Sequence, residues 1–191
     1  MEENVGDVAA TLSPREASDT VSCLGWRYVL GLLRTSVRVQ SLAQAIEVAT
    51  RAVAASGPNT DDHLWVDVRR DRVVLTLQSL ATASVTPQDL ELARRIATVV
   101  RELGRTLDAE VGGGAPRSVQ VLEIAIDALD IASIRPFWKA VMGYADEAGK
   151  AGPEDGLVDP AGQGPAIWFQ QMDAPRPQRN RIHLDISVPH D

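Results

Sequence analysis

Apolar residues recur every three or four positions over residues 42–53 and 90–103, which is the spacing of an amphipathic helix, and a capping pattern predicts a further short helix after Ser13. The predicted helices begin at Ser13, Ser41 and Thr86, because Ser and Thr are favoured helix caps. Glu16 and Gln44 follow the first two caps three residues later, which completes the capping-box pattern. The residues expected on the buried face of the second helix are Leu42, Ala45, Ile46, Ala49, Ala52 and Val53.

Between these helices, apolar and polar residues alternate with a period of two, which predicts strands. The alternating segments are residues 26–30, 32–39, 63–70 and 73–79. Short turns at Gly31 and at residues 70–71 pair them into two hairpins. The order α-β-β-α-β-β-α predicts an α+β fold in which an antiparallel sheet carries helices on one face.

A second set of elements comes after a segment rich in Gly. Strands are predicted over residues 119–126, 156–160, 165–172 and 181–188, with a weaker one near 145–149. A helix is expected over residues 133–144, with Pro136 in its first turn, where a missing N–H costs little. The order of these elements is β-α-β-β-β, followed by one further strand.

Composition divides the chain into four parts. We expect a disordered lead over residues 1–12, a first domain over 13–104, a Gly-rich linker over 105–118 and a second domain over 119–191. The boundary rests on the run Gly112-Gly113-Gly114 and the proline after it. Strand 181–188 would leave exposed apolar surface unless another chain or segment covers it.

Charge and composition exclude several classes of protein. The 191 residues carry a net charge of −7, which argues against a protein that coats nucleic acid. No uncharged run is long and apolar enough to span a bilayer, and the acidic N-terminus lacks the features of a signal peptide. The single cysteine, Cys23, excludes an intrachain disulfide. We therefore expect a cytoplasmic protein, and the predominance of Arg over Lys favours a bacterial source.

The first domain carries several spaced motifs of a known family. They are Leu12-Ser13 with Gly25-Trp26, Asp62-His63-Leu64, and Val85-Thr86 with Asp89 and Leu92-Ala93. Over residues 12–104 this pattern resembles the pterin-4a-carbinolamine dehydratases. The resemblance implies removal of water from a 4a-hydroxytetrahydropterin, in which imidazoles donate and accept protons.

The sequence departs from the family's pattern at the residues of the chemistry. The resemblance places three histidines at positions 62, 63 and 80, and here they are Asp62, His63 and Leu80. His63 and Asp62 are therefore the candidate acid/base pair, and Trp65 and Asp89 the candidate pterin-binding residues. The alternatives are structural: an exposed turn residue for His63, sheet packing for Trp65, and a favourable helix-dipole position for Asp89.

The second domain carries another set of motifs. They are Phe137-Trp138 with Gly143-Tyr144, Asp159-Pro160, Ile167-Trp168-Phe169-Gln170 and Asn180-Arg181-Ile182-His183-Leu184-Asp185-Ile186. This set resembles the glyoxalase-like branch of the vicinal-oxygen-chelate superfamily, whose fold repeats a β-α-β-β-β unit twice. The resemblance implies that residues 119–191 are an incomplete glyoxalase-like domain, with 181–188 as the opening strand of the second unit. The resemblance implies Glu123 and His183 as candidate ligands of a divalent metal, with Gln170 or Gln171 as weaker additions. The alternative is a polar sheet face with no metal, because two ligands are fewer than catalytic sites usually have.

Three functions remain open from the sequence. The favoured one is a small-molecule-binding or assembly protein on a dehydratase-like scaffold with a reduced histidine set, with a pterin as a candidate ligand. The second is an active 4a-hydroxytetrahydrobiopterin dehydratase, a hydro-lyase. The third is a metal-dependent vicinal-oxygen-chelate enzyme of lyase or dioxygenase type. The dehydratase resemblance also implies a homo-oligomer, and we expect neither nucleic acid nor membrane as a partner.

Overall fold

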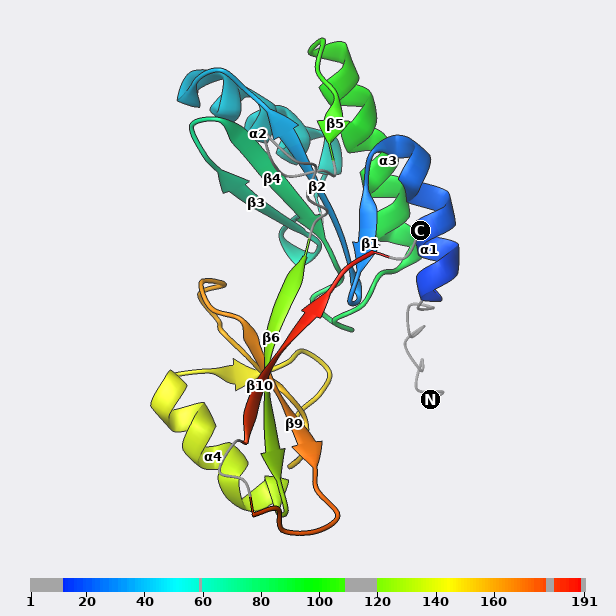
Figure 1. The fold of residues 1–191 in the computed structure, drawn as a ribbon. Coiled ribbons are helices and arrows are strands. Elements are labelled where there is room, and N and C mark those ends of the chain that lie inside the picture. Colours follow the sequence, from blue (N-terminus) through cyan, green and yellow to red (C-terminus); the bar gives the residue numbers. More distant parts are fainter. Residues whose placement is uncertain (1–11, 59, 109–119, 178–180, 190–191) are drawn as a thin grey trace, which may run out of the picture. The chain divides into compact units, whose positions relative to one another are not determined.

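The chain divides into two compact units (Figure 1). A computed structural model describes residues 12–58, 60–108, 120–177 and 181–189. Unit 1 comprises residues 1–119 with 189–191, and unit 2 comprises residues 120–188. The predicted disordered lead, except for Leu12, and most of the predicted linker lie outside the described residues. No helix in these four ranges has the length and apolar character needed to cross a membrane.

Unit 1 has the predicted order α-β-β-α-β-β-α. Its helices are α1 (Pro14–Val21), α2 (Leu42–Ser56) and α3 (Pro87–Glu102), with short 3₁₀ turns at Ser22–Leu24 and Thr60–Asp62. Its strands are β1 (Arg27–Val29), β2 (Leu32–Arg38), β3 (Leu64–Val68), β4 (Arg72–Leu77) and β5 (Leu107–Asp108). The sheet order is β1-β2-β4-β3, every pairing is antiparallel, and β5 extends the sheet beside β2. This confirms the α+β prediction.

The core of unit 1 lies between the three helices and one face of the sheet. Alternate residues of the central strands β2 and β4 are fully buried there: Leu33, Val37, Val73, Leu75 and Leu77. The largest fully buried side chain is Trp26, at the start of the first hairpin. The period-two pattern of the sequence thus has its expected cause, a sheet with one covered face.

Two of the three predicted helix starts show how the caps form. The Ser13 hydroxyl accepts a hydrogen bond from the Glu16 amide, and the Glu16 carboxylate accepts one from the Ser13 amide. At α2 only half of the predicted box forms. The Ser41 hydroxyl accepts from the Gln44 amide, but the Gln44 side chain accepts instead from the Gln40 amide.

The predicted buried face of α2 is wrong for its large residues. Leu42, Ile46 and Val53 are 53%, 54% and 44% exposed. The residues that α2 buries are instead mostly small: Ala45, Val48, Ala52 and Ser56. Small side chains let the helix axis approach α3 and the sheet closely, so packing distance rather than hydrophobicity selects the buried face. Three large apolar residues are left on the outside of α2.

The sheet of unit 1 reaches into the range predicted as a linker. Leu107 pairs with Val37 and Asp108 with Ser36, and the Ser36 hydroxyl donates to the Asp108 carbonyl at 2.8 Å. Leu107 lies close to Gly25, since a Cβ added to Gly25 would lie 2.8 Å from the Leu107 Cβ. Residues 109–118 of the predicted linker lie outside the described part of the chain.

Unit 2 is the predicted β-α-β-β-β half module with one further strand. Its elements are β6 (Val121–Ala128), α4 (Ile131–Met142), β7 (Ala145–Asp146), β8 (Leu157–Val158), β9 (Ala166–Gln171) and β10 (Ile182–Ser187). The sheet order is β10-β6-β9-β8-β7, with β6 parallel to β9 and the other pairs antiparallel. Helix α4 packs against β9, over a core that includes Ile126, Leu157, Ile167 and Phe169.

Helix α4 begins two residues earlier than predicted. Asp130 is its N-cap, and the Asp130 carboxylate accepts a hydrogen bond from the Ser133 amide at 3.0 Å. Pro136 therefore lies in the second turn, inside the helix, and not in the first turn. At that position the missing N–H removes one internal helix bond. The prediction took Ser133 as the helix start and overlooked the equally good cap at Asp130.

Gly25→Ala tests the contact between the first hairpin and β5. Gly25 has a left-handed φ of +84°, and its added Cβ would also meet the Leu107 carbonyl oxygen at 2.8 Å. The left-handed backbone costs about 1–2 kcal/mol for a non-glycine residue, and overpacking adds about 1–3 kcal/mol. Gly104→Ala is the matched control, because Gly104 has φ +68° and nothing within 4 Å of its added Cβ. In urea unfolding, Gly25→Ala should lose clearly more stability than Gly104→Ala; equal losses would contradict this packing.

Candidate functional site

His63 is held at the junction between the Thr60–Asp62 turn and strand β3. Its backbone amide donates to the Thr60 carbonyl at 3.1 Å, and its carbonyl accepts from the Gln78 amide at 3.0 Å. The Leu80 amide donates to the Asp62 carbonyl at 2.9 Å. These bonds bring positions 62, 63 and 80 to the same corner of unit 1. They are the three positions at which the dehydratase resemblance places imidazoles.

The side chain of His63 forms a buried pair with Asp89 near the start of α3. Nδ1 of His63 lies 2.8 Å from Oδ1 of Asp89. His63 is 8% exposed and Asp89 is 0% exposed. The other carboxylate oxygen, Oδ2, accepts from the Thr86 amide at 2.7 Å and from the Thr86 hydroxyl at 2.8 Å. Asp89 is therefore fully hydrogen-bonded, as a buried carboxylate must be.

This arrangement fixes the chemistry available at the imidazole. The Asp89 carboxylate is a hydrogen-bond acceptor at both of its oxygens. The proton that it shares with His63 therefore lies on Nδ1 of the ring. The neutral ring then has its lone pair on Nε2, and Nε2 makes no hydrogen bond to any residue in the described ranges. The pair is thus an oriented imidazole that can accept a proton at Nε2 and return it.

The two positions beside His63 contribute no second imidazole. Asp62 and Leu80 are both exposed, Leu80 to 44%. A leucine side chain carries no proton-transfer group. Of these three positions, His63 alone supplies an imidazole.

The predicted residue Trp65 is not brought to the His63–Asp89 pair. Leu64 and Val66 pack against the core of unit 1, and Trp65 lies between them in β3. Because side chains alternate along a strand, Trp65 faces the side of the sheet away from that core. Trp65 is 42% exposed, and its role as a pterin-binding residue stays a prediction.

Thr86 is the site residue that the sequence predicted only as a helix cap. Its side chain is buried, and both its amide and its hydroxyl hold Asp89. The spacing of Thr86 and Asp89 was visible as a capping pattern. The contact between Asp89 and His63, which lies 26 positions earlier, was not visible in the sequence, because no local pattern predicts it.

In unit 2 the predicted metal ligands lie on one face of the sheet. The register pairs His183 with Ala125 and Asp185 with Glu123, so all four share the face away from the α4 side. The Trp168 indole donates to Asp185 at 2.9 Å, and the Trp168 ring meets the His183 ring edge to face. Glu123 and His183 are therefore diagonal neighbours on adjacent strands.

A buried carboxylate, Asp127, ends this polar face. Its side chain is 8% exposed, and Oδ2 accepts from Arg176 at 3.2 Å. Its Oδ1 is buried with no hydrogen-bond partner among the described residues, and His183 Nδ1 lies 3.8 Å away from it. Nε2 of the same imidazole lies 3.8 Å from Asp185 Oδ1. His183 thus lies between two carboxylates.

Unit 2 presents two candidate ligands of a metal ion, Glu123 and His183, on one face of its sheet. Among the residues that the structure describes, no group of three or more His, Cys, Asp or Glu side chains is arranged to hold one. Gln170 and Gln171 are weak ligands and do not complete such a set. The divalent metal implied by the glyoxalase resemblance stays a prediction.

The pKa of Glu123 is raised above its ordinary value of 4.5, first by burial and then by the carboxylates of Asp185 and Glu147. The folded state therefore holds this proton more tightly than the unfolded chain, and the associated stability is lost as pH rises from 4.5 through the raised pKa. Glu123→Gln should raise the melting temperature of unit 2 at pH 7 and leave it unchanged below pH 4. Glu154→Gln, at an exposed carboxylate, is the control. Equal effects of both variants across that pH range would contradict the assignment.

Comparison with known proteins agrees with the division into two units. Residues 10–99 match the family model described as pterin 4 alpha carbinolamine dehydratase. Residues 123–191 match the model described as a glyoxalase-like domain. The solved transcriptional coactivator/pterin dehydratase from Brucella Melitensis matches over 47% of this chain and 98% of its own, with 22% identity and a TM-score of 0.42.

Curated mycobacterial proteins give the more specific match. A protein of Mycobacterium sp. (strain JLS), named "Putative pterin-4-alpha-carbinolamine dehydratase", is 33% identical over 76 residues, which is 40% of this chain and 80% of the relative. The protein of the same name from Mycolicibacterium smegmatis is 30% identical over 78 residues, 41% of this chain and 82% of the relative. The chain belongs to the pterin-4a-carbinolamine dehydratase family, with a glyoxalase-like domain following the family's domain in the same chain.

Proposed function

We propose that this protein binds a small molecule of the pterin class against His63 and serves as a binding and assembly protein more than as a fast enzyme. The observation that carries the proposal is the buried His63–Asp89 pair, 2.8 Å apart, with no second imidazole at positions 62 and 80. An imidazole held at Nδ1 by a buried carboxylate presents Nε2 in one orientation. Such a group suits recognition of a planar ring with hydrogen-bonding edges.

Fast dehydration needs two proton transfers with different requirements. The leaving hydroxyl takes a proton from an acid, and the ring loses one to a base. With a second imidazole, the site would hold the acid and the base at the same time. Here Leu80 carries no titratable group, and Asp62 is exposed to water. The loss of one partner group in general acid–base catalysis costs about 10²–10⁴ in rate.

The His63–Asp89 pair supports dehydration of a 4a-hydroxytetrahydropterin as a second candidate function. Nε2 of a single oriented imidazole takes the ring proton as a base and then gives that proton to the leaving hydroxyl as an acid. The carboxylate of Asp89 stabilises the imidazolium that exists between the two steps. Both candidate functions therefore depend on His63, and they differ in whether ligand is released unchanged.

Assembly through unit 1 is the other half of the proposal. Leu42, Ile46 and Val53 form an exposed row on α2, at positions that follow one face of the helix. An apolar row of this kind matches a homo-oligomeric contact through the helices of the family domain. A homo-oligomer remains part of this proposal, and light scattering of the full chain at several concentrations tests it.

His63→Asn tests the binding site with little disturbance, because the shorter amide still offers Asp89 a donor. Calorimetry with 7,8-dihydrobiopterin should show about tenfold weaker binding than the parent chain, the loss of about one hydrogen bond. Val68→Ala, at an exposed residue further along β3, is the control for a general disturbance of the strand and should bind as the parent does. Equal affinity of the parent and His63→Asn would overturn the assignment of the site.

Leu80→His tests whether the missing imidazole limits dehydration. The added ring restores a second proton-transfer group beside His63, so dehydration of a 4a-hydroxytetrahydropterin should rise by about 100-fold in the full chain. Leu129→His places a histidine on another exposed leucine, 50% against 44% exposed, and should leave the dehydration rate unchanged. A parent chain that already dehydrates the substrate rapidly would favour the hydro-lyase over the binding protein.

A further inference from the structure

A small pocket lies at the C-terminal end of helix α3, and residues of unit 1 alone line it. The lining residues are Arg38, Gly104, Arg105, Thr106 and Asp108. They surround a volume of about 220 Å³. Small-molecule sites usually have about 300–1,000 Å³, so this pocket suits one compact polar group rather than a whole pterin. A helix rises about 1.5 Å per residue, which places the pocket about 20 Å from Asp89 in the first turn of α3. The pocket is therefore separate from the His63 site.

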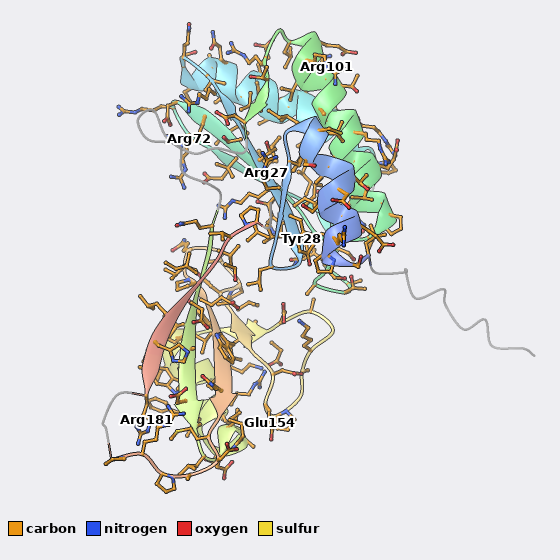
Figure 2. All side chains as sticks on the ribbon, turned by 45° about the vertical axis from the view of Figure 1, so that its right-hand side comes forward. Arg27, Tyr28, Arg72, Arg101, Glu154 and Arg181 are labelled. Atoms are coloured by element: carbon orange, nitrogen blue, oxygen red, sulfur yellow. The ribbon has the colours of Figure 1, made fainter. Side chains whose placement is uncertain are left out.

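The turn that ends α3 puts Arg105 at this pocket. The Gly104 amide donates to the Arg101 carbonyl at 2.9 Å, and the Arg105 amide donates to the Val100 carbonyl at 3.1 Å. With Gly104 in the left-handed region at φ +68°, these two bonds form a Schellman cap. The cap satisfies helix carbonyls that would otherwise repel an anion at this end. Arg101, in the last turn of α3, is labelled in Figure 2 and marks this end of unit 1.

The guanidinium of Arg105 is positioned by one contact and keeps donors for a ligand. Its Nη1 donates to the Arg38 carbonyl at 3.3 Å, and the residue is half-buried. Within the ranges that the structure describes, the Arg105 side chain pairs with no carboxylate. A guanidinium has five N–H donors in a fixed fork, which binds carboxylate or phosphate oxygens two at a time. Arg105 therefore presents a positive charge and further N–H donors to the pocket.

Asp108 shows that the donors of the pocket already bind an oxyanion. Nε of Arg38 donates to Oδ2 of Asp108 at 3.2 Å, so these two charges compensate each other. The charge of Arg105 is left over, in a chain whose net charge is −7. Gly104 leaves its side of the pocket open, because nothing lies within 4 Å of a Cβ added there. The Thr106 hydroxyl adds a neutral donor, so the pocket is a positively charged recess in an acidic protein.

We propose that this pocket binds the phosphate group of a small molecule, with Arg105 as the principal contact and Arg38 and Thr106 as further donors. A phosphate group is anionic at neutral pH, and its oxygens point in tetrahedral directions. It can therefore accept from both guanidiniums and from the hydroxyl at once, whereas the two oxygens of a carboxylate lie in one plane. The bound group competes with Asp108 for Arg38. The proposal does not depend on the proposed pterin function, because the two sites lie at opposite ends of α3.

Calorimetry of the full chain with inorganic phosphate, at an ionic strength held constant with sodium chloride, tests the site. Arg105→Gln should weaken phosphate binding about tenfold, because a charge-assisted hydrogen bond is lost. Arg101→Gln is the matched control, because it removes the same charge from the last turn of α3 outside the pocket and should bind as the parent does. The proposal is overturned if the parent chain shows no saturable binding of phosphate, or if both variants lose affinity equally.

Asp108→Asn gives an effect of opposite sign and does not depend on the Arg105 variant folding. Removal of the carboxylate charge releases the Nε donor of Arg38 and ends a repulsion, so phosphate should bind about fivefold more tightly. The bond from the Ser36 hydroxyl to the Asp108 carbonyl remains, so β5 keeps its place. Asp19→Asn, at an exposed carboxylate of α1, is the control and should leave the affinity unchanged. Weaker or unchanged phosphate binding by Asp108→Asn would contradict the site.

Competition identifies the chemical class of the ligand. Glycerol 3-phosphate, a phosphate monoester, should displace inorganic phosphate from the parent chain, whereas acetate at the same concentration should not. A monoester that fails to displace phosphate, or acetate that binds as tightly as phosphate, would overturn the assignment of the ligand.

Discussion

The hydrogen bond between His63 and Asp89 is the interaction on which the rest of unit 1's site depends. It joins the start of strand β3 to the first turn of α3, two elements that are distant in the sequence. Asp89 is fully buried, so its charge is tolerated only because His63 and both donors of Thr86 satisfy it. The same bond that stabilises the fold also orients the imidazole of the site.

Most of the fold prediction rested on interactions between residues that are close together in the sequence. The caps at Ser13 and Thr86 and the period-two strands are set by neighbouring residues, so the sequence alone indicated them. The errors arose where tertiary packing decides. Helix α2 buries alanines and leaves Leu42 and Ile46 outside, and β5 extends the sheet into a segment with the composition of a linker. Neither outcome follows from hydrophobicity along the chain.

The sequence singled out individual residues of the candidate site, but it did not predict which of them contact one another. His63 and Asp89 were both singled out from the sequence, one as an acid/base group and one as a ligand contact. Their pairing rests on a contact across 26 positions, and it makes Asp89 a positioning residue for the imidazole. In unit 2, Glu123 and His183 do share a face, but Asp127 and Asp185 surround the imidazole and no described set of three ligands forms.

The nitrogen resonances of the His63 imidazole test the central claim most directly. In the ¹⁵N-labelled full chain, we expect a proton on Nδ1 and a lone pair on Nε2, and a shift of the Nε2 resonance when 7,8-dihydrobiopterin is added. Nδ1 should keep its proton in both states because Asp89 holds it. A proton on Nε2 in the free chain, or an Nε2 resonance that does not move at saturating ligand, would contradict the oriented imidazole as the binding group.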